Sequence, residues 1–170
     1  MKYHPDLHHR RSIRLGDFDY STQGAYFVTI CANDAHTAFG RIEEGIMSVN
    51  EIGQMVEQWY KKIGDKFPDI QCDEYIVMPD HFHFIIFNTG ENAEGEHMGS
   101  PLQKVIQWFK AMTTNEYIRN IEKYNWPRFN GRLWQRNYYE HIVRNEYELN
   151  RIREYIKNNP AGGDISDIIK

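Results

Sequence analysis

Apolar positions along the chain recur with two different periods, and together they predict short strands alternating with amphipathic helices. Residues 25–32 are β-branched and aromatic, which indicates a strand, and residues 37–49 indicate a short hairpin around Glu44-Gly45. Asn50 then offers an N-cap, and apolar residues follow it at helical spacing as far as Ile63. The first part of the chain is therefore expected to form a strand, a hairpin and a helix.

The same alternation continues to the C-terminal end. The remaining elements are expected as strands at 71–78, 81–87 and 133–143, a helix starting at Pro101, and a last helix at 145–159. The strands at 71–78 and 81–87 are joined at Pro79-Asp80, which predicts a hairpin. Residues 88–101 are polar and acidic and predict a mobile loop. This order predicts an α+β fold, a ferredoxin-like βαββαβ sandwich with an antiparallel sheet and an added C-terminal helix.

Length and composition limit the possible classes of protein. A chain of 170 residues with 41% hydrophobic residues fits one globular domain, which we place at 21–170 behind an N-terminal arm at 1–20. No stretch of 18 apolar residues predicts a membrane span, and the N-terminal segment lacks the apolar core of a secretory signal. Cys31 and Cys72 lie in apolar segments and are expected to be buried thiols. We therefore expect a cytoplasmic protein.

Charge is distributed unevenly along the chain. The formal net charge is −4, yet residues 1–101 carry 8 Lys and Arg against 16 Asp and Glu, while residues 102–170 carry 12 against 8. A polyanion such as DNA is therefore expected to meet the C-terminal part and the cluster Arg10, Arg11 and Arg14. Chance variation in surface charge explains the same asymmetry equally well.

The candidate chemistry begins with two histidines in the strand at 81–87. His81 and His83 are two residues apart, so both side chains lie on one face of the strand, and two imidazoles side by side form half of a divalent-metal site. The alternative is a pair of structural histidines. In the last helix, Tyr155 and Asn159 are one turn apart on one face, which would place a nucleophile beside an amide ligand. Alternatively, Tyr155 is a core aromatic and Asn159 an ordinary helix end.

Several blocks together resemble the HUH single-strand DNA transposases, specifically the REP-associated tyrosine transposases. The blocks are SIRLGDFDYSTQGAYFVTIC, YIVMPDHFHFII, IQWFKAMTT, WQRNYYEHIVR and YIKNNP, and they span about Arg11 to Pro160. The resemblance implies that His81, His83 and Asn159 bind a metal and that Tyr155 is the nucleophile. Asp80 stands where the family more often has asparagine. Phe84 stands where glycine is more common, and its size is expected to narrow the site.

The resemblance also implies an activity. A divalent metal, Mg²⁺ or Mn²⁺, would assist Tyr155 in nicking and rejoining single-stranded DNA at repeated palindromic hairpins through a 5′-phosphotyrosine. Tyr138, Tyr139 and Tyr147 are competing tyrosines, and we expect Tyr147 to serve packing. The protein is expected to act as a monomer or homodimer.

DNA contacts are expected on the arm and near the last strand. The candidates are Arg10, Arg11, Arg14, Arg136 and His141, with Trp134, Tyr138 and Tyr139 as possible stacking partners of unpaired bases. Strand alternation would place Trp134, Arg136 and Tyr138 on one face. For each of these residues the alternative is a solvated basic surface or a core aromatic.

Two other classes of function remain open at this stage. A protein derived from a transposase can bind DNA hairpins without cleaving them, although an altered Tyr155 or histidine pair would be expected in that case. An RNA-binding module on a ferredoxin-like sheet would need exposed aromatic residues but no histidine pair.

Overall fold

The computed structural model describes residues 23–34, 39–90, 101–160 and 165. The predicted arm at 1–20, with Arg10, Arg11 and Arg14, lies outside these residues, as does most of the acidic segment at 88–101. The strands are β1 (Gly24–Cys31), β2 (Gly40–Glu43), β3 (Ile46–Val49), β4 (Ile70–Val77), β5 (His81–Asn88) and β6 (Tyr139–Val143). The helices are α1 (Glu51–Lys61), α2 (Ile63–Lys66), α3 (Pro101–Tyr124) and α4 (Glu146–Asn158). None of the described helices is long and apolar enough to cross a membrane.

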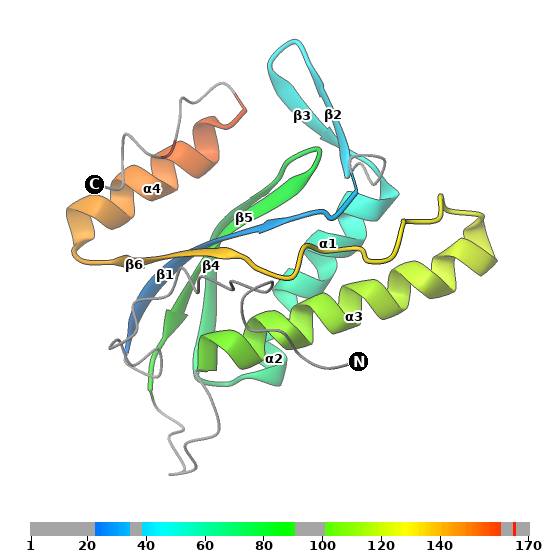
Figure 1. Ribbon diagram of the computed structural model, residues 1–170. Coiled ribbons are helices and arrows are strands. Elements are labelled where there is room, and N and C mark those ends of the chain that lie inside the picture. The colour runs from blue at the N-terminus through cyan, green and yellow to red at the C-terminus, as the bar shows by residue number, and fades with distance from the viewer. Residues whose placement is uncertain (1–22, 35–38, 91–100, 161–164, 166–170) are drawn as a thin grey trace, which may run out of the picture.

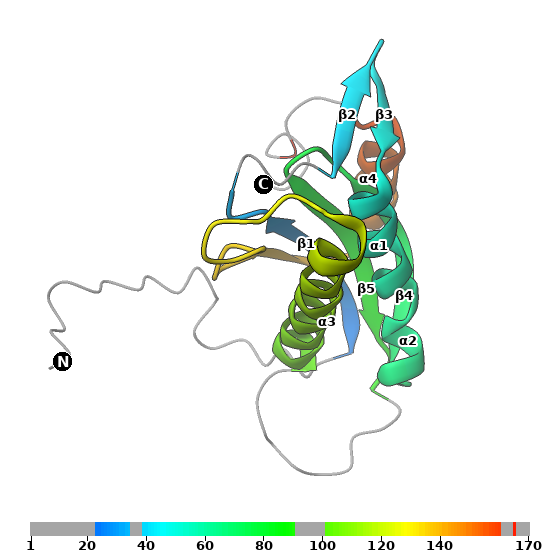
Figure 2. The ribbon, with the colours of Figure 1, turned by 90° about the vertical axis from the view of Figure 1, so that its right-hand side faces the viewer.

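Four strands form one antiparallel sheet in the order β4-β5-β1-β6, and β2 pairs with β3 in a separate hairpin. Helices α1 and α3 lie along one face of the sheet, and α4 lies on the other (Figures 1 and 2). Leaving out the hairpin, the chain runs βαββαβ with α4 added at the end. The predicted ferredoxin-like sandwich is therefore confirmed.

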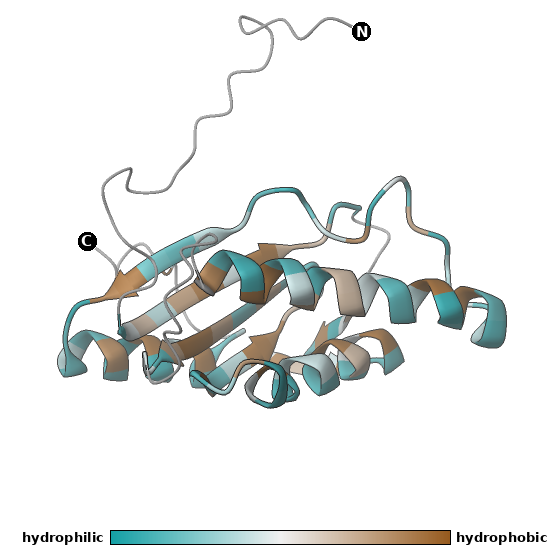
Figure 3. Cartoon of the chain, turned by 90° about the horizontal axis from the view of Figure 1, so that it is seen from below, coloured by the Kyte–Doolittle hydropathy of each residue, from teal (hydrophilic) through white to brown (hydrophobic). Residues whose placement is uncertain are grey.

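The strands divide their side chains between two apolar clusters, because successive residues point to opposite faces. Phe82 and Phe84 of β5 pack toward α1 and α3, in a large cluster that also holds Tyr60 and Phe109. The second cluster, under α4, is small and consists of Phe27, Ile85, Ile152 and Ile156. Figure 3 shows hydrophobic positions concentrated on the strands and hydrophilic positions frequent along the helices.

Most of the predicted elements are present, and their local chemistry explains why. The side chain of Asn50 accepts a hydrogen bond from the Gly53 N–H (3.0 Å), which caps α1 as expected. The predicted hairpin turns at Glu44 and Gly45, both with positive φ. Asn145 caps α4 in the same way as Asn50 caps α1, with its side chain accepting from the Glu148 N–H (2.9 Å).

Several sequence-based expectations were wrong. The strand predicted at 133–143 is present only as Tyr139–Val143, and before it a single bridge joins Trp134 to Ala32. Trp134 is a core residue, 4% exposed, so it is not available to stack on a base. Tyr147 is 74% exposed and does not serve packing, and Cys72 is exposed rather than buried.

Candidate active site

The two histidines of β5 converge at the edge of the sheet face that α4 covers. His81 Nε2 lies 3.0 Å from His83 Nε2, with the ring centroids 4.5 Å apart. Phe84 points to the opposite face, where it is 1% exposed in the large cluster. The expectation that Phe84 narrows the site is therefore wrong, because alternation along the strand separates it from the imidazoles.

Each imidazole is held through its other ring nitrogen. Thr29 Oγ1 lies 2.7 Å from His83 Nδ1, and Asp80 Oδ1 lies 2.6 Å from His81 Nδ1. The Asp80 carboxylate accepts only, so His81 Nδ1 donates and leaves Nε2 free to accept. Thr29 Oγ1 and His83 Nδ1 share the second hydrogen bond, in which the hydroxyl can donate or accept according to the tautomer of the His83 ring. Partners of this kind fix ring orientation in metal-binding histidines.

Thr29 was not identified from the sequence, because its contact with His83 crosses 54 residues. The only signal was its place in a predicted strand. The register makes the contact possible, since Thr29 lies directly opposite His83 in the β1–β5 ladder. Asp80 was noted as unusual, but its hydrogen bond to His81 was not predicted.

His83 is held neutral. Its pKa is lowered from 6.5 to about 3, mainly because burial disfavours the charged ring and next because of the neighbouring His81. The negative charge of Asp80 raises the pKa, but its effect is smaller. At neutral pH the His83 ring therefore has a nitrogen lone pair available for a metal ion or a hydrogen-bond donor.

Tyr155 reaches the same point from α4. Its hydroxyl lies 3.5 Å from His83 Nε2, and its ring meets the His83 ring at 5.7 Å and the Phe27 ring edge-on at 6.5 Å. Phe27 also stacks on His83 at 5.5 Å. The three rings support one another, so the hydroxyl is directed toward the histidine pair.

Packing and ion pairs between α4 and the sheet fix the position of Tyr155. Ile152 and Ile156 are buried on either side of it along the helix and pack in the cluster with Phe27. Toward β4, Arg153 Nε pairs with Asp73 Oδ2 (2.7 Å), and Lys157 Nζ pairs with Glu74 Oε1 (3.0 Å). The tyrosine helix is therefore seated on the sheet of its own chain.

Asn159 ends α4 one turn beyond the tyrosine. Its backbone N–H donates to the Tyr155 carbonyl (3.0 Å), while its side-chain Nδ2 is buried and has no hydrogen-bond partner in the described part of the chain. A half-turn of the amide exchanges Nδ2 for Oδ1, an oxygen of the type that hard cations bind. The helix end thus presents an unsatisfied amide.

These residues fit a divalent metal ion. Two metal–ligand bonds of about 2.1 Å at a right angle separate the ligand atoms by about 3.0 Å, which matches the observed distance between the two Nε2 atoms. Among the described residues, no group of three or more His, Cys, Asp or Glu side chains is arranged to hold a metal. Asn159, whose buried side-chain amide has no hydrogen-bond partner among the described residues, is the candidate for a third protein ligand.

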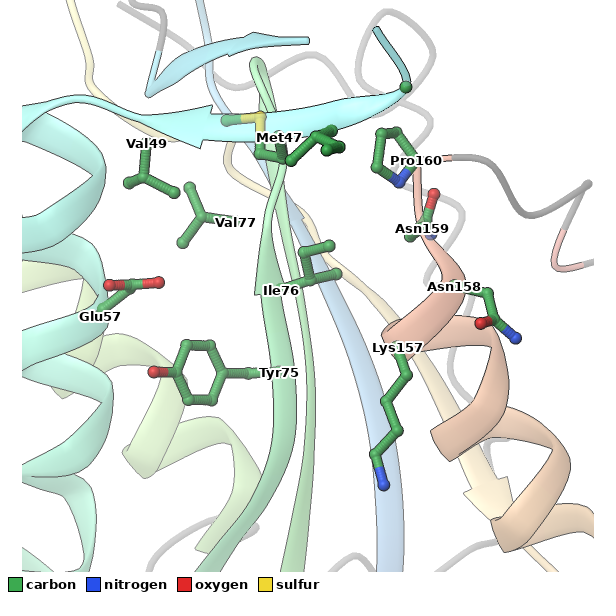
Figure 4. A pocket seen from close by; sticks show the side chains of 12 residues that line it. Met47, Val49, Glu57, Tyr75, Ile76, Val77, Lys157, Asn158, Asn159 and Pro160 are labelled. Atoms are coloured by element: carbon green, nitrogen blue, oxygen red, sulfur yellow. The ribbon is translucent and has the colours of Figure 1, made fainter. Parts of the chain in front are cut away.

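A cavity of about 350 Å³ opens beside Asn159. It lies between the β2–β3 hairpin, β4 and the end of α4. Figure 4 shows Glu57 and Tyr75 on the α1 side of β4, and Lys157 and Asn158 on the α4 side. Asn159 is one of the residues on the wall of this cavity, although its side-chain Nδ2 is itself buried.

The described DNA-contact candidates have different surroundings. Arg136 is exposed, as its proposed role requires. His141 is not free, because its Nε2 lies 2.9 Å from Glu148 Oε1 and its side chain is 13% exposed. This contact gives His141 a structural role in joining β6 to α4, whereas Arg136 has a side chain open to a ligand.

Known proteins show which family this arrangement matches. The family model described as "Transposase IS200 like" matches residues 32–159. A Haemophilus influenzae protein of uncharacterised function is 39% identical over 168 residues, covering 94% of this chain and 92% of its own length. A second H. influenzae protein, named "Putative REP-associated tyrosine transposase", is 22% identical over 155 residues, covering 89% of this chain and 78% of its own.

A solved structure has the same fold. It is described as a REP-associated tyrosine transposase bound to a REP hairpin, and it superposes with a TM-score of 0.55 at 17% identity, covering 81% of this chain and 67% of that one. At this identity the match supports the fold alone. The resemblance inferred from the sequence blocks is confirmed at the level of the family.

Proposed function

Because this chain belongs to the IS200-like transposase family, we propose that it nicks and rejoins single-stranded DNA through a covalent link to Tyr155. The observation that carries the proposal is the convergence of three side chains from β5 and α4. The Tyr155 hydroxyl lies 3.5 Å from His83 Nε2, which in turn lies 3.0 Å from His81 Nε2. These distances support a role for Tyr155 as a nucleophile beside a pair of metal ligands.

Tyr155 would act as the nucleophile in a phosphoryl transfer. Its phenolic oxygen forms a bond to the scissile phosphorus, and the bond from phosphorus to the 3′-oxygen breaks. The phenolic proton is lost and the released 3′-oxygen gains one, leaving a 5′-phosphotyrosine and a free 3′-hydroxyl. The reverse reaction with another 3′-hydroxyl rejoins the strand, so neither water nor ATP is consumed.

His81, His83 and Asn159 would hold the divalent ion that this chemistry needs. Such an ion, Mg²⁺ or Mn²⁺, would polarise the phosphate and so compensate for the weak nucleophilicity of a phenol. Asp80 and Thr29 keep the two Nε2 atoms directed at one point, and burial keeps His83 uncharged. Imidazole ligands favour Mn²⁺ over Mg²⁺.

The seating of α4 supports action within one chain. Tyr155 meets the His83 of its own chain, and ion pairs from Arg153 and Lys157 fasten the helix to β4 of the same sheet. A nucleophile donated by a second subunit would require these contacts to break. We therefore propose that the active unit is a single chain.

The proposed substrate is a DNA hairpin with a single-stranded flank. The support is the fold shared with a protein described as bound to a REP hairpin, together with the family match. The described Arg136 is exposed on the chain segment leading into β6. Together with Arg10, Arg11 and Arg14 of the N-terminal segment, it is our proposed phosphate contact.

A covalent-adduct assay tests this function. The protein is mixed with end-labelled hairpin oligonucleotides drawn from repeats of its own genome, with Mn²⁺, and run on a denaturing gel. We expect a shifted band that disappears with EDTA and in Tyr155→Phe. Tyr147→Phe is the matched control, because this tyrosine lies two turns earlier on the same helix and is exposed; its adduct should equal that of the unmodified protein.

Other outcomes would identify a different function. A retarded complex on a native gel without any covalent band would favour a hairpin-binding protein that does not cleave. An adduct that persists in Tyr155→Phe would show that another tyrosine is the nucleophile.

A further inference from the structure

At one side of the catalytic sheet face, Tyr139 of β6 remains 42% exposed beside helix α4. Helix α4 packs on Phe27 and Ile85, which are cross-strand partners. Two residues further along β1, the next row across the sheet on this face consists of Thr29 and its partners on β5 and β6. In the ladder, Thr29 lies opposite both His83 of β5 and Tyr139 of β6. Directly opposed residues in antiparallel strands share a face, so Tyr139 stands on the catalytic face level with His83.

Tyr139 is an exposed aromatic residue in this position. It is 42% exposed, whereas the preceding Tyr138 packs against the cluster under α1 and α3. The pKa of the Tyr139 hydroxyl is raised by partial burial and then by Glu148 of α4, which agrees with a side chain beside the helix that carries Tyr155. Two strand spacings separate Tyr139 from His83 across the sheet, which is about 10 Å between their backbones.

The chain before Tyr139 bulges out of the sheet. Trp134 pairs with Ala32 and Tyr139 pairs with Thr29. Trp134 and Tyr139 are five residues apart in sequence, whereas Thr29 and Ala32 are only three apart. The two additional residues break the ladder, which is why the predicted strand at 133–143 is shortened. Bulges of this kind are frequent beside active sites, where they redirect side chains.

Lys110 of α3 holds the bulge in shape. Its Nζ donates to the carbonyl oxygens of Gln135 (2.8 Å), Arg136 (3.3 Å) and Asn137 (3.3 Å). One turn away, Thr113 Oγ1 accepts from Trp134 Nε1 (2.8 Å) and anchors the start of the segment. Because one ammonium group donates to three carbonyls, it fixes the backbone of the bulge. The Arg136 side chain is not part of these contacts and is exposed.

We propose that Tyr139 and the Lys110-held bulge at 135–138 bind the single-stranded DNA next to the scissile phosphate, with the Tyr139 ring stacking on an unpaired base. The inference rests on the proposed function, because it takes the scissile phosphate to lie at His81 and His83. The separation of about 10 Å corresponds to roughly one to three nucleotides of a single strand. Stacking is tolerant of sequence because every base has a π face.

Photocrosslinking in a Tyr155→Phe background tests the contact without any need for cleavage. The probes are DNA hairpins with mixed-sequence single-stranded flanks, each carrying one 5-iodouracil at a defined distance from the stem. We expect mass spectrometry to find Tyr139 in the crosslinked peptide. In the same background, Tyr139→Ala should weaken binding of the flanked hairpin about tenfold, and Tyr139→Phe, which keeps the ring, should bind within about twofold.

Tyr124→Ala is the matched control, because Tyr124 is 56% exposed at the far end of α3. It should leave the affinity unchanged. A crosslink map without Tyr139, an unchanged affinity in Tyr139→Ala, or no binding of the flanked hairpin would overturn the proposal. If these results are as expected while the unmodified protein forms no covalent adduct, the DNA contact stands and only the nicking function fails.

The role of Lys110 is to position the bulge, so its variant needs a separate readout. Lys110→Met should reduce the Tyr139 crosslink and weaken binding, and it should add little when combined with Tyr139→Ala, because both act through one contact. Lys110→Arg, which keeps a multivalent donor, should restore part of the crosslink. If the losses of affinity in Lys110→Met and Tyr139→Ala are fully additive, Lys110 does not act through the Tyr139 contact.

Discussion

The two faces of the sheet are made of alternate residues of the same strands, and they differ in what their side chains do. On the face toward α1 and α3, β5 contributes Phe82 and Phe84 to a large, closed apolar cluster. On the face toward α4, the same strand contributes His81 and His83, and the apolar cluster beneath the helix is small. If the histidines act as we propose, one strand contributes to stability with one face and to chemistry with the other, at single-residue intervals.

The difference has a physical cause. A buried imidazole is costly unless a partner satisfies it, and the α4 face provides such partners in Thr29, Asp80 and Tyr155. The opposite face needs no polar partners, because aromatic rings fill it. The large cluster can therefore carry most of the folding energy while the α4 face keeps polar side chains close together and partly open.

The largest effect is expected from removing a histidine on the α4 face. In His83→Ala, adduct formation should fall at least about 1,000-fold, or ~4 kcal/mol of transition-state stabilisation, because a metal ligand is lost. The free energy of unfolding should change by only about 1 kcal/mol. Adduct yield and urea denaturation measure the two quantities, and full Mn²⁺-dependent activity in His83→Ala would refute the metal assignment.

The opposite face should respond in the opposite way. Phe84→Ala is expected to lower the free energy of unfolding by about 3–5 kcal/mol, because it opens a cavity in the large cluster. Ile42→Ala, on the exposed hairpin (45% exposed), is the control and should stay within about 0.5 kcal/mol. If Phe84→Ala cost no more than Ile42→Ala, the large cluster would not be the main source of stability.

A finer comparison concerns Asp80, which holds His81. Asp80→Ala should weaken Mn²⁺ binding about 10- to 100-fold, because the partner of Nδ1 is lost. Asp80→Asn retains an acceptor oxygen, so a loss of only a few-fold is expected. Calorimetric titration with Mn²⁺ measures both affinities. Equal losses in the two variants would mean that the charge of Asp80, and not its hydrogen bond, supports the site.

The smallest effect is a pH dependence at the far end of α4. Burial alone would raise the pKa of Glu148, but hydrogen bonds from the Arg144 N–H and from His141 hold it below its usual value. A carboxyl with a lowered pKa stabilises the fold above its unfolded-state pKa and loses that contribution as the pH falls through its folded-state pKa.

Between about pH 5 and pH 3, the unmodified protein should therefore lose on the order of 1 kcal/mol more stability than Glu148→Gln. Urea denaturation at several pH values measures this difference. Parallel stability curves for the two proteins would show that the contact with His141 and Arg144 contributes nothing.

The α4 face was partly predictable from the sequence. Strand alternation placed His81 and His83 on one side, and helical spacing placed Tyr155 on the last helix. Asn159, expected on the same helical face, instead follows the end of α4 with an extended backbone. Both inferences depend only on local geometry. The family resemblance then linked the two segments, because periodicity alone does not determine which helix packs on which strand.

Features that depend on contacts distant in sequence could not be predicted. The bulge before β6 exists because Lys110 satisfies carbonyls about 25 residues further along, so alternation through 133–143 gave a strand that is too long. The same limitation hid the contact of Thr29 with His83 and the burial of Trp134 against Thr113. The local pattern of apolar residues predicted which helices and strands form. Where those elements end depends on side-chain contacts between segments that are distant in sequence.

We propose that Tyr155 works with the histidines of its own chain. The most direct measurement mixes His83→Ala, which keeps the tyrosine, with Tyr155→Phe, which keeps the histidines, and looks for covalent adduct with labelled hairpin DNA and Mn²⁺. We expect a strong adduct with the unmodified protein and none with the mixture, even after long incubation at high protein concentration. Adduct restored in the mixture would contradict it, because the tyrosine of one chain would then serve the metal site of another.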